Sequence, residues 1–252
     1  MKKFLIVPAL LLSFLTFSCS DDDNDTPPID PSSLIPVTFE VMRASTFNYK
    51  QFYQAEETAD TRKGIVILAH GDETDENDFT LNDQCTALAQ QGYVAVTTSY
   101  NIPENSTLAQ TNLLFKNQMN EVIADITEVF DIPRNKVIIG GLSRGGNNSF
   151  ALVLPEQAGI TPIEGIKGVI LECSGGDTWK GSAILFPVAY MSTLNDNVME
   201  SNANEFKTGL TQNNNAGVSS ASECLIIPGT GHCTEAGQYK AFVVMKVKQW
   251  LP

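Results

Sequence analysis

The order of hydrophobic and polar positions predicts a domain in which strands and helices alternate. Residues 37–42 alternate between apolar and polar side chains, and residues 47–53 do so less regularly, which is typical of an antiparallel pair of strands. Continuous apolar runs come later, as expected for strands that are buried on both faces of a parallel sheet. These runs occupy residues 64–71, 93–100, 137–139, 168–173, 186–191 and 224–228.

Helical patterns separate these runs. The longest spans residues 106–130 and has apolar side chains at three- and four-residue steps, with Ser106 as the expected N-cap and Pro133 beyond its end. The others occupy residues 81–91, 144–154, 198–210 and 235–250. Because strands and helices alternate from residue 64 onward, we expect a mainly parallel sheet of about eight strands covered by helices on both faces.

The stretch 137–146, with the sequence VIIGGLSRGG, carries the clearest chemical signal. A strand closes on Gly141-x-Ser143-x-Gly145 and a helix follows, which has the form of a nucleophile elbow. Side chains at Gly141 and Gly145 would collide with the neighbouring strand and helix in so tight a turn. Ser143 would then stand beside the first free N–H groups of the helix.

Composition suits one globular domain and a leader. The chain has 252 residues, of which 42% are hydrophobic, and its formal net charge is −13. An acidic surface argues against nucleic acid as a partner and against electrostatic adsorption to anionic lipid.

The N-terminus has the features of an export signal. Two lysines precede the apolar run 4–12, and the stretch ends on Ser18-Cys19. This resembles a bacterial lipoprotein signal, in which the cysteine carries lipid, although Thr16 stands where leucine is usual. The alternative is a plain cleaved signal with an incidental cysteine.

We therefore divide the chain into a signal peptide (1–18), an acidic and proline-rich tether (19–35) and a folded domain (36–252). The expected location is exported and lipid-anchored through Cys19 at a bacterial membrane, either periplasmic or on the cell surface. The acidic run after Cys19 also resembles the surface-export signals of some bacterial lipoproteins, but the same composition serves as a spacer.

Four cysteines remain beyond the leader: Cys85, Cys173, Cys224 and Cys233. An even number in an oxidising compartment allows disulfides, and their pairing stays open. Cys224 and Cys233 are not expected to pair with each other, because the strand after Cys224 holds them apart. No Cys-x-x-Cys occurs and there are only two histidines, so we expect neither a metal site nor a cofactor.

Taken together, the elbow and the alternating pattern resemble an α/β-hydrolase of the dienelactone hydrolase or esterase kind, from about residue 36 to the C-terminus. In that family the nucleophile, the acid and the base follow in this order along the chain. A serine nucleophile needs a base, and only His70 and His232 are available. His232 follows the last strand, where the family has its base. His70-Gly71 resembles the family's oxyanion-hole turn, and we expect a structural role for His70.

The resemblance assigns the acid to Asp196, in the loop after the strand 186–191. Asp177 and Glu172 are rivals near the end of the preceding strand, and a turn-forming role for Asp196 is a further alternative. Oxyanion donors would be the backbone N–H groups of Arg144 and Asp72. The acidic residues of the loop 72–78 are expected to form a solvated face, because the calcium-binding EF-hand pattern lacks its glycine.

The resulting hypothesis is an exported serine hydrolase that cleaves carboxylic esters through Ser143, His232 and Asp196. The segment 174–185 is too short for a large lid, which favours small soluble esters or polymer-borne ones such as acylated carbohydrate. Alternatives are a peptidase of the same fold and a non-catalytic surface lipoprotein that binds glycan or protein. Fold by itself does not separate these functions.

Overall fold

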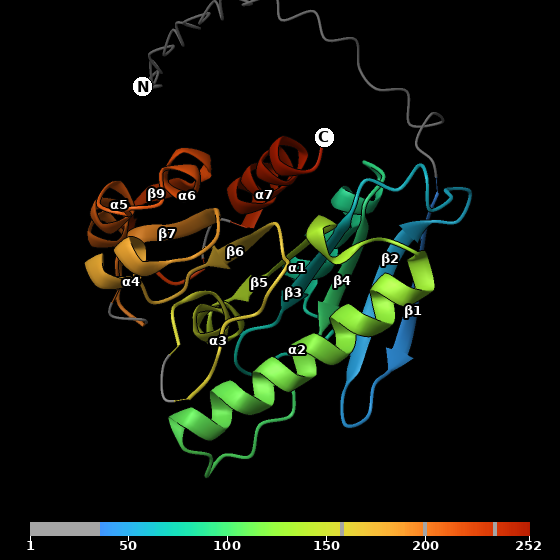
Figure 1. Cartoon of the computed structure of the whole chain (residues 1–252), viewed down its shortest axis with the longest axis horizontal. Coiled ribbons are helices and arrows are strands. Elements are labelled where there is room, and N and C mark those ends of the chain that lie inside the picture. Colours follow the sequence, from blue (N-terminus) through green and yellow to red (C-terminus); the bar gives the residue numbers. More distant parts are fainter. Residues whose placement is uncertain (1–35, 157–158, 199–200, 234–235) are drawn as a thin grey trace, which may run out of the picture. The chain divides into compact units, whose positions relative to one another are not determined.

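A computed structural model describes residues 36–156, 159–198, 201–233 and 236–252. Within them, nine strands form one sheet (Figure 1). The strands are β1 (Val37–Arg43), β2 (Asn48–Gln54), β3 (Ile65–Ala69), β4 (Val94–Thr98), β5 (Val137–Leu142), β6 (Gly168–Glu172), β7 (Val188–Asp196), β8 (Ser201–Asn202) and β9 (Glu223–Thr230).

The strand order is β1-β2-β4-β3-β5-β6-β7-β8, and β9 also pairs with β7. β1 and β2 form the expected antiparallel pair, and β2 joins β4 in an antiparallel sense. The remaining long strands run parallel to one another, with β5 between β3 and β6. The carboxyl ends of β3, β5, β6, β7 and β9 therefore meet at one edge of the sheet, where ligands bind in open parallel sheets.

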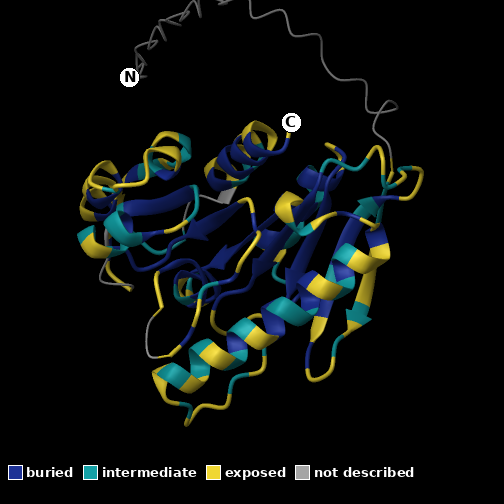
Figure 2. Cartoon of the chain, in the orientation of Figure 1, coloured by how far each residue is buried: buried dark blue, intermediate teal, exposed yellow. Residues whose placement is uncertain are grey.

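Helices cover both faces of this sheet (Figure 1). One apolar cluster contains the buried side of α2 (Leu108–Phe130) together with residues of α3 (Arg144–Val153) and α5 (Ala203–Thr211). The second cluster contains α1 (Phe79–Ala89) and α7 (Ala236–Trp250). Figure 2 shows the buried strands between these layers. The expected mainly parallel sheet with helices on both faces is confirmed.

Several boundaries differ from the sequence expectation. Thr107, not Ser106, caps α2, because its hydroxyl accepts from Gln110 N while the Gln110 side chain accepts from Thr107 N. β7 runs to Asp196, which therefore ends a strand instead of lying in a loop beyond it.

Two short helices were missed, and one expected helix starts late. The missed helices are α4 (Thr178–Ala183) and α6 (Ala216–Ala221), each of six residues and too short for a clear helical period. The helix expected over 198–210 instead begins at Ala203, after the short strand β8. None of the helices in the described part of the chain has both the length and the apolar character of a membrane span.

Candidate active site

Three side chains that are far apart in the sequence meet at the carboxyl edge of the sheet. Ser143 follows β5 directly, Asp196 is the last residue of β7, and His232 lies just beyond β9. His232 Nε2 lies 2.7 Å from Ser143 Oγ, and His232 Nδ1 lies 2.7 Å from Asp196 Oδ2. The Asp196 side chain is fully buried, whereas that of His232 is 20% exposed. The structure thus joins a hydroxyl, an imidazole and a carboxylate in one hydrogen-bonded chain.

The donor and acceptor roles in this hydrogen-bonded series follow from the chemistry of the three side chains. A carboxylate only accepts, so His232 Nδ1–H donates to Asp196 Oδ2, and Nε2 is left to accept from the Ser143 hydroxyl. The other oxygen of Asp196 accepts from Val198 N at 3.0 Å, which fixes the carboxylate against its own turn. This arrangement suits proton transfer from Ser143 to His232.

Ser143 sits in a strained turn. Its φ is 52° and its ψ is −116°, in a region that residues with a side chain rarely adopt. A Cβ at Gly145 would lie 2.3 Å from Ala69 O, and one at Gly141 would lie 2.5 Å from the same oxygen. The expected steric need for both glycines is confirmed. The turn is held in place by backbone packing against β3.

The backbone N–H groups expected as oxyanion donors belong to the residue after Ser143 and to the residue after Gly71. Arg144 opens α3, so its N–H belongs to the first turn, where no intrahelical acceptor exists. Gly71 packs against Ser143, because a Cβ at Gly71 would lie 3.2 Å from Ser143 Cβ, and Asp72 is the next residue. The side chains of Arg144 and Asp72 also form an ion pair with an N–O distance of 2.7 Å.

His70 has the structural surroundings that were expected for it. Its ring stacks on Tyr100 with a centroid distance of 4.4 Å and an interplanar angle of 7°. Its Nδ1 lies 2.5 Å from Gly71 O. His70 is buried, with 7% of its surface exposed. These contacts support the turn that leads to Asp72.

The two rival acids lie elsewhere. Asp177 caps α4 by accepting from Lys180 N at 2.7 Å. Glu172 ends β6, and its side chain turns to α1, where it accepts a hydrogen bond of 2.7 Å from Gln84 Nε2. Burial raises the pKa of Glu172 to about 8, the Gln84 hydrogen bond works in the opposite direction, and the charge of Asp78 adds to the rise.

The expectation that loop 72–78 forms a solvated face is wrong for Glu76. Glu76 is only 7% exposed, and its carboxylate accepts from Ser99 Oγ and Asn48 Nδ2. Asp78 caps α1 by accepting from Leu81 N at 3.0 Å. The Glu76 carboxylate turns inward because hydroxyl and amide donors satisfy it, whereas the half-buried Asp78 caps a helix.

A disulfide links Cys173 and Cys233, with a Cα–Cα distance of 5.4 Å. Cys233 follows His232 directly, and Cys173 follows the last residue of β6. Cys85 and Cys224 are free thiols, so the expectation that Cys224 does not pair with Cys233 is confirmed. The pairing itself was not predicted, because four cysteines allow several connectivities.

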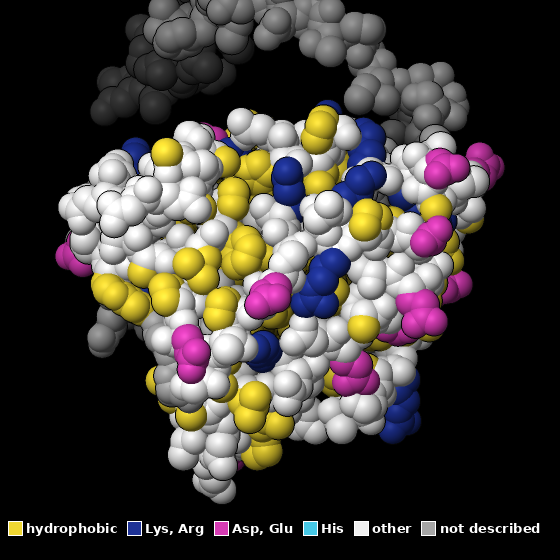
Figure 3. Space-filling model, viewed as in Figure 1, with side chains coloured by type: hydrophobic (Ala, Val, Ile, Leu, Met, Phe, Trp, Pro, Cys, Tyr) yellow, Lys and Arg dark blue, Asp and Glu magenta, His cyan; other side chains and the backbone are white. Residues whose placement is uncertain are grey.

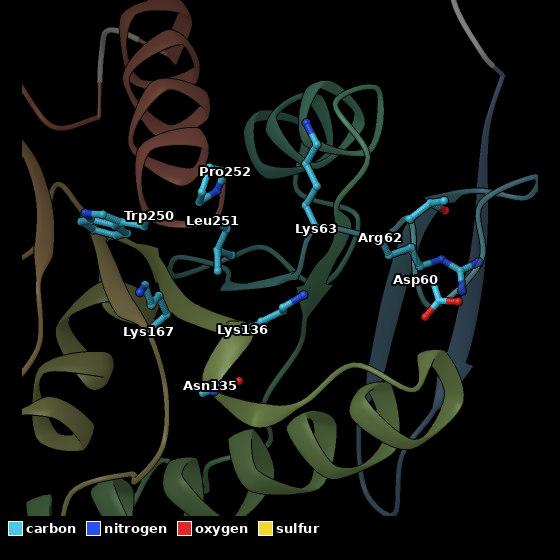
Figure 4. Close-up of a pocket in the computed structure, with 10 residues that line it drawn as sticks. Asp60, Arg62, Lys63, Asn135, Lys136, Lys167, Trp250, Leu251 and Pro252 are labelled. Atoms are coloured by element: carbon cyan, nitrogen blue, oxygen red, sulfur yellow. The ribbon is translucent and has the colours of Figure 1, made fainter.

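A separate cavity of about 450 Å³ lies at the opposite edge of the sheet (Figure 4). Its walls include Lys63, Lys136 and Lys167, which precede β3, β5 and β6. In the view of Figure 3, Lys and Arg side chains lie near the middle of the molecular surface, and acidic side chains lie mainly along the side of β1 and β2. Since Ser143 follows the carboxyl end of β5, this basic cavity is not part of the candidate active site.

No protein-family model and no curated protein sequence matches the chain. Several solved structures, however, are similar to it in fold. A protein assigned to the dienelactone hydrolases, from Klebsiella pneumoniae, has a TM-score of 0.62 at 12% identity, over 86% of this chain and 98% of that one. A thermophilic esterase from Thermogutta terrifontis has a TM-score of 0.61 at 14% identity, over 87% and 96%.

The feruloyl esterase module from Clostridium thermocellum has a TM-score of 0.59 at 12% identity, over 84% of this chain and 87% of that one. At such low identities the likeness concerns the fold. The chain therefore has the α/β-hydrolase fold that its sequence pattern resembles.

Proposed function

Proceeding from an α/β-hydrolase fold, we propose that this protein is a serine hydrolase that cleaves carboxylic esters. The observation that carries the proposal is the hydrogen-bonded chain from Ser143 Oγ through His232 to Asp196, with 2.7 Å at each step. The esterases among the similar solved structures support the same reaction class. Fold likeness alone does not carry it, because this scaffold hosts many activities.

In the first half-reaction, Ser143 Oγ attacks the ester carbonyl carbon and its proton passes to His232 Nε2. The backbone N–H groups of Arg144 and Asp72 stabilise the oxyanion that forms on the carbonyl oxygen. As this intermediate collapses, the bond to the alcohol oxygen breaks and the leaving alkoxide takes the proton from His232. An acyl group remains on Ser143.

In the second half-reaction, His232 takes a proton from water, and the hydroxide attacks the acyl carbon. The bond to Ser143 Oγ breaks, Ser143 recovers the proton from His232, and the acid leaves. Asp196 holds the imidazole by its Nδ1–H and stabilises the imidazolium that forms in both steps. Its full burial makes this charge interaction strong.

The substrate we propose is a small or polymer-borne ester, such as an acylated carbohydrate. Between β6 and β7 the chain has only the six-residue helix α4 and its connections, and part of the His232 side chain is exposed. An open site of this kind admits an ester group that projects from a larger molecule. We further propose export and lipid anchoring through Cys19, a residue that lies outside the described part of the chain.

Ester hydrolysis by the purified protein tests the proposal. We expect turnover of p-nitrophenyl acetate and butyrate, and covalent labelling of Ser143 by a fluorophosphonate probe. Ser143→Ala should abolish labelling and lower kcat by at least about 10⁴-fold. Ser220→Ala, which changes an exposed serine on α6, is the matched control and should retain both activities.

The other functions correspond to distinct outcomes. Labelling of Ser143 without ester turnover, together with cleavage of a peptide library, would indicate a peptidase of this fold. A folded protein that neither labels nor turns over any of these substrates would contradict the hydrolase proposal and favour a binding lipoprotein.

A further inference from the structure

The last residue of β6 and the residue after it contact all three elements of the candidate active site. Glu172 O accepts from the backbone N–H of Ser143 at 2.7 Å. Cys173 N donates to Met191 O at 2.7 Å, in the strand that ends at Asp196. The Cys173 side chain forms the disulfide with Cys233, beside His232. Two adjacent residues therefore tie the nucleophile strand, the acid strand and the base loop to one point.

The backbone at both ends of the disulfide leaves the ordinary regions. Cys173 has a φ of 47° and Cys233 a φ of 54°, so both lie in the left-handed region that non-glycine residues seldom occupy. Such conformations persist where surrounding contacts hold them, and they gather at functional sites. Here they direct the two cysteine side chains toward each other across the edge of the sheet.

In the described part of the chain, residues 231–233 form the loop that carries His232, and Cys233 packs against the apolar cluster that contains α1 and α7. Thr193 Oγ1 donates to Gly231 O at 2.5 Å, and His232 Nδ1 reaches Asp196. Gly231 in this loop and Gly229, near the end of β9, both have positive φ, and a Cβ at Gly229 would meet nothing within 4 Å. These two hydrogen bonds come from β7 and a third joins His232 to Ser143, so in the described part of the chain the disulfide is the covalent link from this loop to the residue after β6.

We propose that the Cys173–Cys233 disulfide is a positioning device that holds His232 Nε2 within hydrogen-bond reach of Ser143. Glu172 O fixes Ser143 through its N–H, and the next residue fixes the base through its sulfur, so the distance between nucleophile and base is set by one short segment. Cys173 and Cys233 touch neither substrate nor reacting atoms. The expected effect of the disulfide on turnover rests on the proposed function. Its expected effect on the position of His232 does not.

Reduction should relax this geometry. A dithiol such as dithiothreitol would convert the bridge into two thiols and itself become a cyclic disulfide. The base would then rely on its contacts with β7. Because a misplacement of about 1 Å can cost a factor of 100 in rate, we expect kcat to fall by about 10- to 100-fold with KM little changed.

The first measurement reads the imidazoles directly, without any substrate. The chain has only two histidines, so protein labelled with ¹⁵N-histidine gives one signal set for His232 and one for His70. In the oxidised protein we expect a strongly downfield Nδ1–H proton from the His232–Asp196 hydrogen bond. Reduction should weaken or remove this signal and leave His70, which stacks on Tyr100, unchanged.

The second measurement compares turnover in variants. Cys173→Ala/Cys233→Ala should reproduce the reduced wild type and be insensitive to the dithiol. Cys224→Ala removes a free cysteine on β9 and is the matched control, which should keep both full turnover and sensitivity. Mass spectrometry after alkylation counts the thiols, and circular dichroism establishes that each sample is folded. If the double variant does not fold, the folded wild type after reduction is compared with the oxidised wild type instead.

The outcomes separate this proposal from the proposed function. Unchanged kcat and an unchanged His232 signal in folded protein with the bridge verified as reduced would overturn the positioning role. Loss of the His232 signal on reduction, in a protein that never hydrolyses an ester, would keep the positioning role and remove the esterase. A fall in thermal stability with no change in kcat or in the His232 signal would indicate a merely structural disulfide.

Discussion

The turn around Ser143 and the loop around His232 meet at one hydrogen bond but are held in different ways. In the turn, main-chain atoms approach so closely that a Cβ at Gly145 would lie 2.3 and 2.4 Å from two carbonyl oxygens of β3 and the residue after it. At the end of β9, which leads into the loop, a Cβ at Gly229 would meet nothing within 4 Å. The nucleophile is fixed by close packing of the backbone, whereas the base is fixed by a few side-chain contacts and one disulfide.

This difference has a consequence for tolerance to change. A closely packed turn admits no added atom, because interiors have little free volume and carbonyl oxygens in a sheet cannot move independently. A loop held at a few points tolerates added atoms but is sensitive to the loss of any one contact. A substitution that adds atoms should therefore destabilise the turn more than the loop. A substitution that deletes a contact should have its main effect in the loop.

The largest expected effect is that of Gly145→Ala. The added methyl group would overlap Ala69 O and His70 O, so the turn or β3 would have to shift, and we expect a loss of at least about 4 kcal/mol or no folded protein. Gly229→Ala meets open space and has only the conformational cost of its φ of 117°, about 1 to 2 kcal/mol. Urea denaturation measures both. Equal losses would contradict the contrast between turn and loop.

A second test concerns Glu172, at the point where turn and loop are joined. Burial raises the pKa of its carboxyl to about 8, so the folded state keeps a proton that the unfolded state loses above about pH 4.5. The contribution of the Glu172 carboxyl to the free energy of unfolding is therefore full at low pH. It declines by roughly 3 kcal/mol as the pH rises from about 5 to 8.

Glu172→Gln should remove that decline. The amide oxygen retains an acceptor for Gln84 Nε2, and no charge has to form in the core. The variant should be the more stable of the two proteins at pH 8 and close to wild type at pH 5, as measured by urea denaturation at a series of pH values. Parallel pH profiles for the two proteins would show that Glu172 does not titrate within this range.

The same contrast explains what the sequence predicts and what it leaves open. Gly141, Ser143 and Gly145 form a local pattern, and a local steric requirement can be recognised within ten residues. The alternation of apolar runs and helical periods likewise predicts the sheet and its two helical layers. The chain order of Asp196 and His232 came from the family resemblance, and their contact with Ser143 depends on strands separated by long stretches of sequence.

Contacts between distant loops were beyond the sequence pattern. The Cys173–Cys233 bridge depends on two left-handed residues at the ends of different strands, and no local signal marks them. The burial of Glu76 depends on Ser99 and Asn48, which belong to other elements. The short helix α4 was missed because six residues give less than two turns of periodicity.

A contact-deleting test in the loop is Thr193→Val. The two side chains have nearly the same shape, but valine cannot donate to Gly231 O. We expect a loss of about 1 to 2 kcal/mol and a fall in kcat of roughly tenfold, because the residue before His232 would lose an anchor. Thr193→Ser keeps the donor and should recover most of the activity. Equal kcat for the valine and serine variants would contradict this anchoring role.

The smallest expected effect is that of Asp72→Asn, which removes the charge that pairs with Arg144 beside Ser143. The side chains of Arg144 and Asp72 are 50% and 61% exposed, so solvent screens the pair, and we expect a change in stability of no more than about 0.5 kcal/mol. The backbone N–H groups of both residues, which we propose as oxyanion donors, are retained. Turnover should therefore stay within about threefold of wild type, whereas a loss of a hundredfold would mean that the side-chain pair, and not only the packed backbone of the turn, orients those donors.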